Sequence, residues 1–168
     1  MPNDVPSAST YPGAGPRHFA FHPNRRFAYV INEMGNTVTL FGYDATQGTL
    51  NELQTVSTLP EDFEGRTHCA DIHLSQSGAY LYGSNRGHDS IALFKVDPDA
   101  GTLTPIGYQS TLGKTPRNFG LAPNGDYLLA ANQDTDNITV FEVDQETGQL
   151  APTGHATQVP APVCIQWL

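Results

Sequence analysis

The sequence predicts an all-β protein built from four-stranded antiparallel blades of a β-propeller, and three observations support this fold class. First, a ten-residue segment at 15–24 is repeated at 115–124 and, in a more diverged form, at 69–78. Second, equivalent residues of the three copies lie 53 and then 47 positions apart, close to the ~40–50 residues of a propeller blade. Third, each repeat contains short apolar or alternating runs between turn signals, and no helical period competes with them.

A single partial propeller is expected to span the whole chain (1–168), with repeats at about 16–60, 68–113 and 115–160. Each repeat is expected to form four strands, joined by turns rich in Gly, Asn, Asp and Pro. The expected strands are 17–21, 27–32, 37–43 and 50–58 in the first repeat, 71–74, 79–84, 90–96 and 103–111 in the second, and 118–121, 127–132, 137–143 and 150–159 in the third. Four aromatic residues are expected in the core: Phe41, Phe94, Phe141 and Trp167.

The two chain ends add partial copies of the repeat. Residues 162–168 resemble the start of a repeat and are expected to form a closing strand, while 5–12 resemble the end of one. Closed propellers usually contain about four to eight blades. Three blades and a closing strand therefore predict either part of a larger ring or a subunit that closes with another chain. Uncovered sheet edges would also permit self-association.

The composition excludes several classes of function. The formal net charge is −9, so a phosphate backbone would be repelled and nucleic-acid binding is not expected. The first residues are polar and acidic, unlike a signal peptide, and no run of about 18 apolar residues predicts a membrane span. Cys69 and Cys164 lack the spacing of metal ligands, and they are expected to remain free thiols in a reducing cytoplasm.

Polar residues gather at two equivalent places of the repeat, the head of the first strand and the end of the second. In an antiparallel pair these places lie side by side, so both sets should converge near the channel mouth at one face of the ring. The first set is Arg17, His18, Asp71, His73, Arg117 and Asn118, and the second is Asn32, Glu33, Asn85, Arg86, Asn132 and Gln133. The three arginines in so acidic a chain predict an anionic ligand held by bidentate contacts.

Departures from the repeat separate candidate functional residues from scaffold. His18 and Glu33 are replaced by Asn118 and Gln133 in the third repeat. Arg86 stands at the Glu33 position in the second repeat. Because a residue that maintains the scaffold should recur, these departures favour functional roles for His18, Glu33 and Arg86.

The recurring residues have a structural alternative. The asparagine that ends the second strand, Asn85 in the second repeat, occurs in all three repeats, which favours a turn-capping role. Arg17 and Arg117 could tie neighbouring blades together through backbone carbonyls. The histidines show no metal-ligand spacing, so no metal site is expected, and His22 is expected at the surface.

Longer motifs carry a family resemblance. They are 13–23 (GAGPRHFAFHP), 29–33 (YVINE), 70–75 (ADIHLS), 81–91 (LYGSNRGHDSI), 115–119 (TPRNF) and 160–165 (PAPVCI). Together they resemble the lactonase family of seven-bladed β-propellers, which includes bacterial 6-phosphogluconolactonase and the fungal carboxy-muconate cyclase. The resemblance covers practically the whole chain and corresponds to the last three blades and the closing strand of proteins about twice this length.

The resemblance implies a cytosolic hydrolase that opens a sugar-phosphate δ-lactone, 6-phosphogluconolactone, to 6-phosphogluconate with no metal or organic cofactor. It implies catalytic roles for His18, Glu33 and Arg86. The substrate-binding residues that we expect are Arg17, Arg117, His73 and Asn85. Lactone hydrolysis needs a base to activate water and donors to hold the developing oxyanion. His18 or Glu33 could be the base, and Arg86 or Arg117 could hold the oxyanion and the phosphate.

Two other classes of function stay open. One is a cycloisomerase acting on a carboxy-muconate-type substrate, whose carboxylates arginines would also bind, and assays with both substrates side by side would separate the two. The other is a non-catalytic propeller scaffold that binds proteins. Its partner would be indifferent to His18→Ala and Glu33→Ala.

Overall fold

The repeated pattern produces three four-stranded antiparallel sheets in the computed structural model, which describes residues 7–167. The strands are β1 (Pro16–Phe21), β2 (Phe27–Asn32), β3 (Thr37–Asp44) and β4 (Thr49–Ser57) in the first sheet, β5 (His68–Leu74), β6 (Tyr80–Arg86), β7 (Ser90–Val96) and β8 (Leu103–Ser110) in the second, and β9 (Pro116–Leu121), β10 (Tyr127–Asn132), β11 (Asn137–Val143) and β12 (Leu150–Gln158) in the third. A single turn of 3-10 helix, η1 (Gln133–Thr135), follows β10. Within residues 7–167 no helix reaches the length and apolarity that crossing a bilayer requires.

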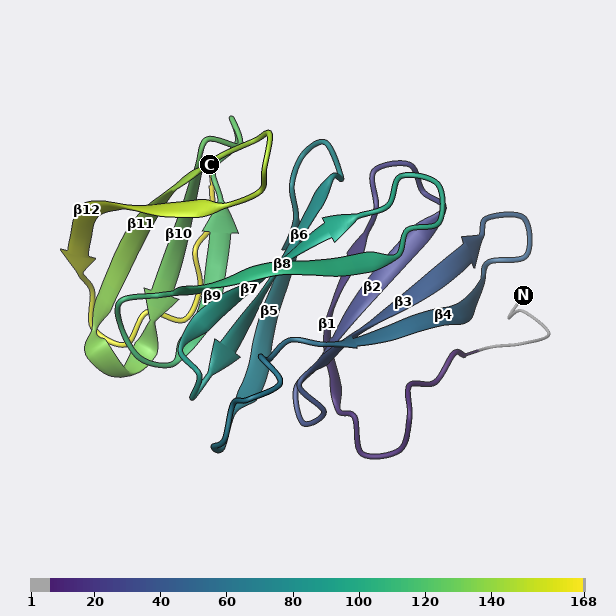
Figure 1. Ribbon diagram of the computed structural model, residues 1–168, viewed down its shortest axis with the longest axis horizontal. Coiled ribbons are helices and arrows are strands. Elements are labelled where there is room, and N and C mark those ends of the chain that lie inside the picture. Colours follow the sequence, from purple (N-terminus) through teal and green to yellow (C-terminus); the bar gives the residue numbers. More distant parts are fainter. Residues whose placement is uncertain (1–6, 168) are drawn as a thin grey trace.

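The sheets stand side by side like blades, with β1, β5 and β9 as the inner strands and β5 between the other two (Figure 1). This arrangement confirms the predicted all-β propeller fold class. It also brings the heads of three inner strands, which are far apart in the sequence, to one end of the molecule.

The hydrophobic cores lie between the sheets, because a single four-stranded sheet cannot enclose a core by itself. The core between the first and second sheets includes Tyr29, Ile31, Leu40, Leu81 and Phe94. The core between the second and third includes Tyr82, Leu93, Phe119, Leu128 and Phe141. The recurring phenylalanines Phe41, Phe94 and Phe141 are at most 2% exposed, which confirms their predicted place in the core.

A tyrosine on the second strand fastens each of the first two sheets to the next. The Tyr29 hydroxyl donates to the carbonyl of Gly101 (2.8 Å), and the Tyr82 hydroxyl donates to that of Gly148 (3.2 Å). Gly101 has a φ of +71°, and a Cβ at this position would lie 2.6 Å from the Phe27 ring. The close approach of the two sheets therefore requires glycine at this turn.

The segment 162–167 does not form the expected strand. It is irregular, and Pro162 has no N–H to contribute to a ladder. The segment nevertheless lies beside β9, because the Ile165 N–H donates to Asn118 Oδ1 (2.7 Å). The Phe119 N–H makes the same kind of contact with Asp71 Oδ2 (3.3 Å) one sheet earlier. Residues 162–167 thus occupy the place of a next inner strand, but no strand within residues 7–167 pairs with them.

Two further expectations were wrong. Trp167, expected in the core, is 44% exposed, because no sheet among the described residues covers the outer face of the third sheet. His22, expected at the surface, is buried and donates through Nε2 to the carbonyl of Gly78 (3.2 Å). Residues 7–12, which resemble the end of a repeat, are irregular, and residues 1–6 lie outside the described part of the chain. Self-association through the open faces stays a prediction.

Candidate functional site

A bulge at the head of each inner strand gathers the polar residues at one end of the sheets. The pairing register shifts between Pro16 and His18 in β1, between Cys69 and Ile72 in β5, and at the head of β9. A bulge inserts one extra residue and re-aims the side chains around it. Neighbours such as Arg17 and His18, which a regular strand would send to opposite faces, therefore both contribute to one site.

The ends of the second strands lie beside these heads, as the antiparallel pairing requires. In the ladders Pro16 pairs with Asn32, and His68 pairs with Arg86. The carbonyl of Glu33 then accepts a hydrogen bond from the Cys69 N–H (3.1 Å), which joins the turn after β2 to the head of β5. The predicted convergence of the two polar sets is confirmed.

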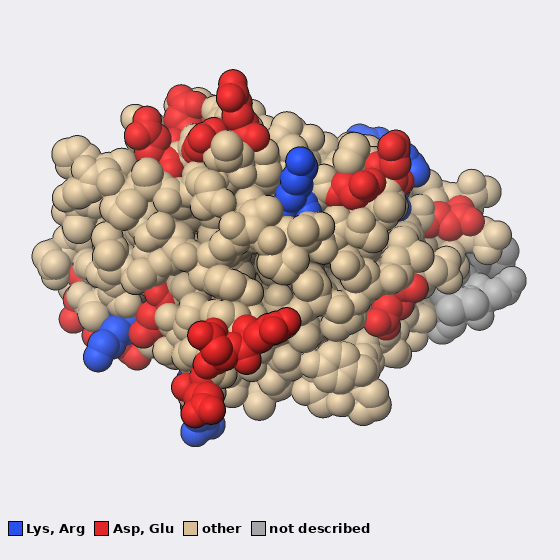
Figure 2. Space-filling model, in the orientation of Figure 1, with Lys and Arg blue, Asp and Glu red and all other residues tan. Residues whose placement is uncertain are grey.

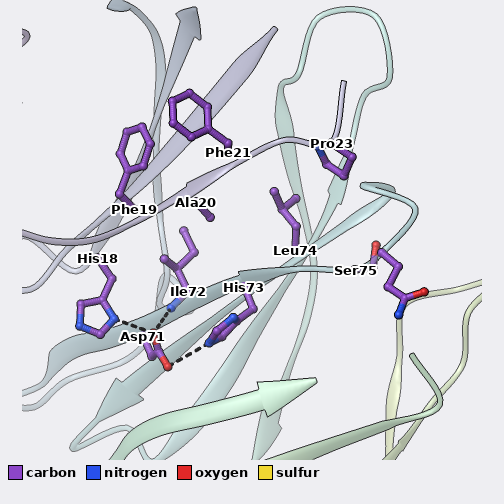
Figure 3. Close-up of a pocket in the computed structure, with 11 residues that line it drawn as sticks. His18, Phe19, Ala20, Phe21, Pro23, Asp71, Ile72, His73, Leu74 and Ser75 are labelled. Atoms are coloured by element: carbon purple, nitrogen blue, oxygen red, sulfur yellow. Dashed lines mark hydrogen bonds and ion pairs between the residues drawn. The ribbon is translucent and has the colours of Figure 1, made fainter. Parts of the chain in front are cut away.

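Asp71, near the head of β5, is the centre of the first cluster (Figure 3). Its buried carboxylate accepts five hydrogen bonds, from His18 Nδ1 (2.6 Å), His73 Nε2 (3.1 Å), Asn118 Nδ2 (2.5 Å) and the backbone N–H groups of Ile72 (3.0 Å) and Phe119 (3.3 Å). Burial alone would raise the pKa of Asp71, but the hydrogen bonds and charges of His73 and His18 outweigh burial and lower it to about 2. The carboxylate is therefore ionised at neutral pH.

Glu33, in the turn after β2, is the centre of the second cluster. Its carboxylate accepts from Arg86 Nη2 and, at 3.4 Å, from Arg17 Nη1. The same arginines reach the second sheet, because Arg17 Nε donates to the carbonyl of Ala70 (3.1 Å) and Arg86 Nη2 to that of Cys69 (2.8 Å). The hydrogen bond from Arg86 lowers the pKa of Glu33, and the charges of Arg86 and Arg17 lower it further against the opposing effect of burial. Glu33 is thus an ionised side chain held between two guanidinium groups.

The histidines of the Asp71 cluster line an open cleft of about 630 Å³ between β1 and β5. The side chains of His18 and His73 are 42% and 41% exposed, so both rings are accessible from the cleft. The apolar side of the cleft is formed by Phe19, Phe21, Ile72 and Leu74 (Figure 3). An apolar wall with a few convergent polar groups is typical of small-molecule sites.

The structure brings five of the seven predicted site residues into these two clusters. His18 and His73 belong to the Asp71 cluster, and Arg17, Glu33 and Arg86 form the Glu33 cluster. Arg117 lies at the head of β9, at the same end of the sheets as the two clusters. Its side chain makes no hydrogen bond or ion pair within residues 7–167. Asn85 is fully buried and hydrogen-bonds to Thr58 and Ser90, which places it away from the cleft. These contacts argue against substrate binding by Asn85 and fit the turn-capping alternative.

Asp71 is the residue that sequence reasoning left out of the candidate site. It stands at the repeat position of His18 and Asn118 and departs from both, which is the same signal that selected His18. The sequence does not show that side chains at this one position contact each other across three sheets. That contact depends on the bulges and on the spacing between the inner strands.

Replacing Asp71 by asparagine should lower stability in a pH-dependent way. An aspartate whose pKa falls from 3.8 to about 2 on folding stabilises the folded state above its unfolded pKa, by about 2 kcal/mol at neutral pH. This stabilisation is lost as the pH falls through the folded pKa. Urea denaturation at pH about 7 and about 3 should therefore show a smaller difference in unfolding free energy between protein and variant at the lower pH. Equal differences at both pH values would contradict this account.

The arginines at the site stand out against an acidic molecule. Acidic side chains are spread over the face shown in Figure 2, and basic ones are few. Five of the eight basic residues nevertheless lie at the same end of the sheets: Arg17, Arg86 and Arg117 on the strands, and Arg66 and Lys114 in the loops that lead into β5 and β9. Such a cluster favours a small anionic ligand over a polyanion, which the remaining charge would repel.

Fold and site together define a class of protein, a β-propeller whose inner strands carry an open cleft lined by histidines and a neighbouring cluster of arginines. The family description "Lactonase, 7-bladed beta-propeller" matches residues 2–167, and the chain therefore belongs to the lactonase family of seven-bladed β-propellers.

Relatives and solved structures agree with this assignment. The chain is 44% identical over 162 residues to the 6-phosphogluconolactonase of Bacillus subtilis (strain 168), an alignment that covers 96% of this chain and 46% of the relative. The periplasmic gluconolactonase PpgL of Pseudomonas aeruginosa superposes with a TM-score of 0.90 at 36% identity, covering 95% of this chain and 44% of that one. A protein of Lactobacillus plantarum gives a TM-score of 0.87 at 37% identity, covering 90% and 44%. The chain thus spans about half the length of the proteins it matches.

Proposed function

We propose that the site binds an anionic sugar lactone and takes part in the hydrolysis of 6-phosphogluconolactone to 6-phosphogluconate. The observation that carries this proposal is a pair of neighbouring networks, in which His18 is paired with the buried Asp71 and Glu33 with Arg17 and Arg86. The adjacent residues Arg17 and His18 of β1 contact the adjacent residues Ala70 and Asp71 of β5. The name of the Bacillus subtilis relative supports the same substrate.

His18 is the base in this proposal. A water molecule attacks the carbonyl carbon of the lactone while His18 takes one of its protons, and the carbonyl oxygen becomes an oxyanion that guanidinium groups stabilise. When the carbon–oxygen bond of the ring breaks, the ring oxygen takes the proton back from His18 and leaves as a hydroxyl, and the carbonyl carbon becomes the carboxylic acid. Glu33 is a weak candidate for the base, because its lowered pKa and its two ion pairs suit it to holding the arginines in place.

Arg117 is assigned to the phosphate. Arg17 and Arg86 already contact Glu33 and backbone carbonyls. Among Arg17, Arg86 and Arg117, Arg117 is the one whose side chain has no partner within residues 7–167. A guanidinium group matches the geometry of a phosphate through paired hydrogen bonds.

Rates of lactone hydrolysis test the function and the phosphate assignment together. The chain should hydrolyse 6-phosphogluconolactone faster than the spontaneous reaction, and Arg117→Gln should raise its KM about tenfold, which corresponds to the loss of one charge-assisted contact. Unphosphorylated gluconolactone, the substrate class named for the Pseudomonas relative, should show no change of KM in Arg117→Gln. The matched control is Lys95→Gln, an exposed cation at the other end of the sheets. A folded chain that never exceeds the spontaneous rate with either lactone would contradict the proposed function.

A cytoplasmic location is part of the proposal. Both cysteines are free, Cys69 buried and Cys164 exposed, and free thiols persist in a reducing compartment. Because the Pseudomonas relative is periplasmic, the location should be tested by fractionating the host cell. Recovery of the chain in the periplasmic fraction would contradict a cytoplasmic location.

A further inference from the structure

We infer that Asp71 is a positioning residue that fixes opposite tautomers of His18 and His73, so that His18 presents its unprotonated Nε2 as the base. This inference rests on the proposed function for its catalytic consequence. Its structural part, the tautomer of each ring, can be measured without any turnover.

The tautomer of His18 follows from the chemistry of its partner. An ionised carboxylate only accepts hydrogen bonds, so the Nδ1 atom that lies 2.6 Å from Asp71 Oδ1 must carry the proton. A neutral imidazole has one protonated nitrogen, which leaves a lone pair on Nε2. The ring lines the cleft with 42% of its side chain exposed, and in Figure 3 its second nitrogen points away from Asp71.

The tautomer of His73 is the reverse. Its Nε2 donates to Asp71 Oδ2 at 3.1 Å, which leaves Nδ1 unprotonated in the neutral ring. The ring also packs edge-on against Phe119, with centroids 4.8 Å apart. One carboxylate thus holds two imidazoles from neighbouring sheets in opposite tautomers, and only His18 exposes Nε2 as an acceptor.

The carboxylate is itself held rigidly. Asn118 donates its amide to Asp71 Oδ2, and its Oδ1 accepts the Ile165 N–H, which fixes the orientation of that amide. The Ile72 N–H donates to Oδ1 and the Phe119 N–H to Oδ2. A side chain fixed by packing and by a surrounding shell of hydrogen bonds holds a catalytic group in one geometry.

The number of donors around each carboxylate oxygen determines which histidine Asp71→Asn should affect. Oδ2 receives three hydrogen bonds and Oδ1 receives two. The single amide oxygen of the variant should therefore take the Oδ2 place, and the NH2 group should take the Oδ1 place beside His18. His18 then faces a donor and must change to the Nε2–H tautomer, whereas His73 keeps its acceptor and its tautomer.

The test is the ¹⁵N chemical shift of each ring nitrogen, measured at an alkaline pH above which these shifts no longer change with pH. In the unchanged protein His18 should be protonated at Nδ1 and His73 at Nε2. In Asp71→Asn only His18 should change. A second variant, His73→Gln, leaves Asp71 and His18 in place and should leave the His18 tautomer unchanged. If His18 is protonated at Nε2 in the unchanged protein, or keeps its tautomer in Asp71→Asn, the inference is wrong.

Turnover provides the second readout. Asp71→Asn should lower kcat about 100-fold with KM within about twofold, since the wrong tautomer removes the base but leaves the substrate contacts. His18→Gln should lower kcat similarly, and the double variant should be no worse than either single one. A kcat of Asp71→Asn near that of the unchanged protein would overturn the positioning role. If the unchanged protein shows no hydrolysis, the proposed function fails, and the tautomers still decide whether Asp71 positions the two rings.

Discussion

Arg86→Ala is expected to lower kcat/KM for lactone hydrolysis at least tenfold. Removing one donor that stabilises a developing oxyanion typically costs about 100-fold or more in rate. Arg86 also holds Glu33 and the Cys69 carbonyl, so the loss of its guanidinium leaves Glu33 with Arg17 as its ion-pair partner. The Nε–H of Arg86 is buried and has no partner within residues 7–167.

Two variants control the Arg86 result. Arg26→Ala removes an arginine from the other end of the first sheet, where it donates to the Asp99 carbonyl, and should leave kcat/KM within about twofold. Arg86→Lys keeps the charge but not the planar fork, so it should recover only part of the rate. A rate for Arg86→Ala equal to that of the unchanged protein would remove Arg86 from the site.

Phe94→Ala should have the largest effect on stability, with a loss of about 3–5 kcal/mol in the free energy of unfolding. Phe94 is fully buried in the core between the first and second sheets, where it packs with residues of both. Its removal leaves a cavity at the contact that holds two blades together. Because a whole domain is stable by only about 5–15 kcal/mol, Phe94→Leu provides a milder substitution that should lower stability by a smaller amount in the same direction.

Urea denaturation measures the loss of unfolding free energy in Phe94→Ala and Phe94→Leu, and Phe21→Ala is the matched control. Phe21 is 52% exposed on β1, so its truncation should cost less than about 1 kcal/mol. Similar losses for Phe21→Ala and Phe94→Ala would contradict a core that lies between the sheets.

The strands were predictable because each blade repeats the same sequence of turns and apolar runs. Phe41, Phe94 and Phe141 occupy one position of the repeat, and each is buried in the structure. The chain end was predicted less well. Residues 162–167 copy the start of a repeat, but a strand also needs a ladder partner, and no described strand pairs with them. The same lack of a neighbouring sheet leaves Trp167 exposed.

The location of the candidate site was predictable, and the contacts between its residues were not. Antiparallel pairing was enough to place Arg17 and Glu33 together. The partners of His18 and Arg86 lie 53 positions away along the chain, at Asp71 and Glu33. Those contacts depend on the bulges and on the packing of one blade against the next, which no local pattern in the sequence encodes. For the same reason Asn85 was assigned to substrate binding, although the structure buries it among Thr58 and Ser90.

The most direct test of the central claim is a titration of the chain with 6-phosphogluconate, followed through the NMR signals of the arginine Nε–H groups. We expect the signals of Arg17, Arg86 and Arg117, which lie at the site end of the sheets, to shift together with one binding curve. Arg25 and Arg26, in the turn between β1 and β2 at the other end, should not move and serve as internal controls. Shifts confined to Arg25 and Arg26, or no shift at any arginine up to millimolar product, would contradict an anionic-lactone site at this end of the sheets.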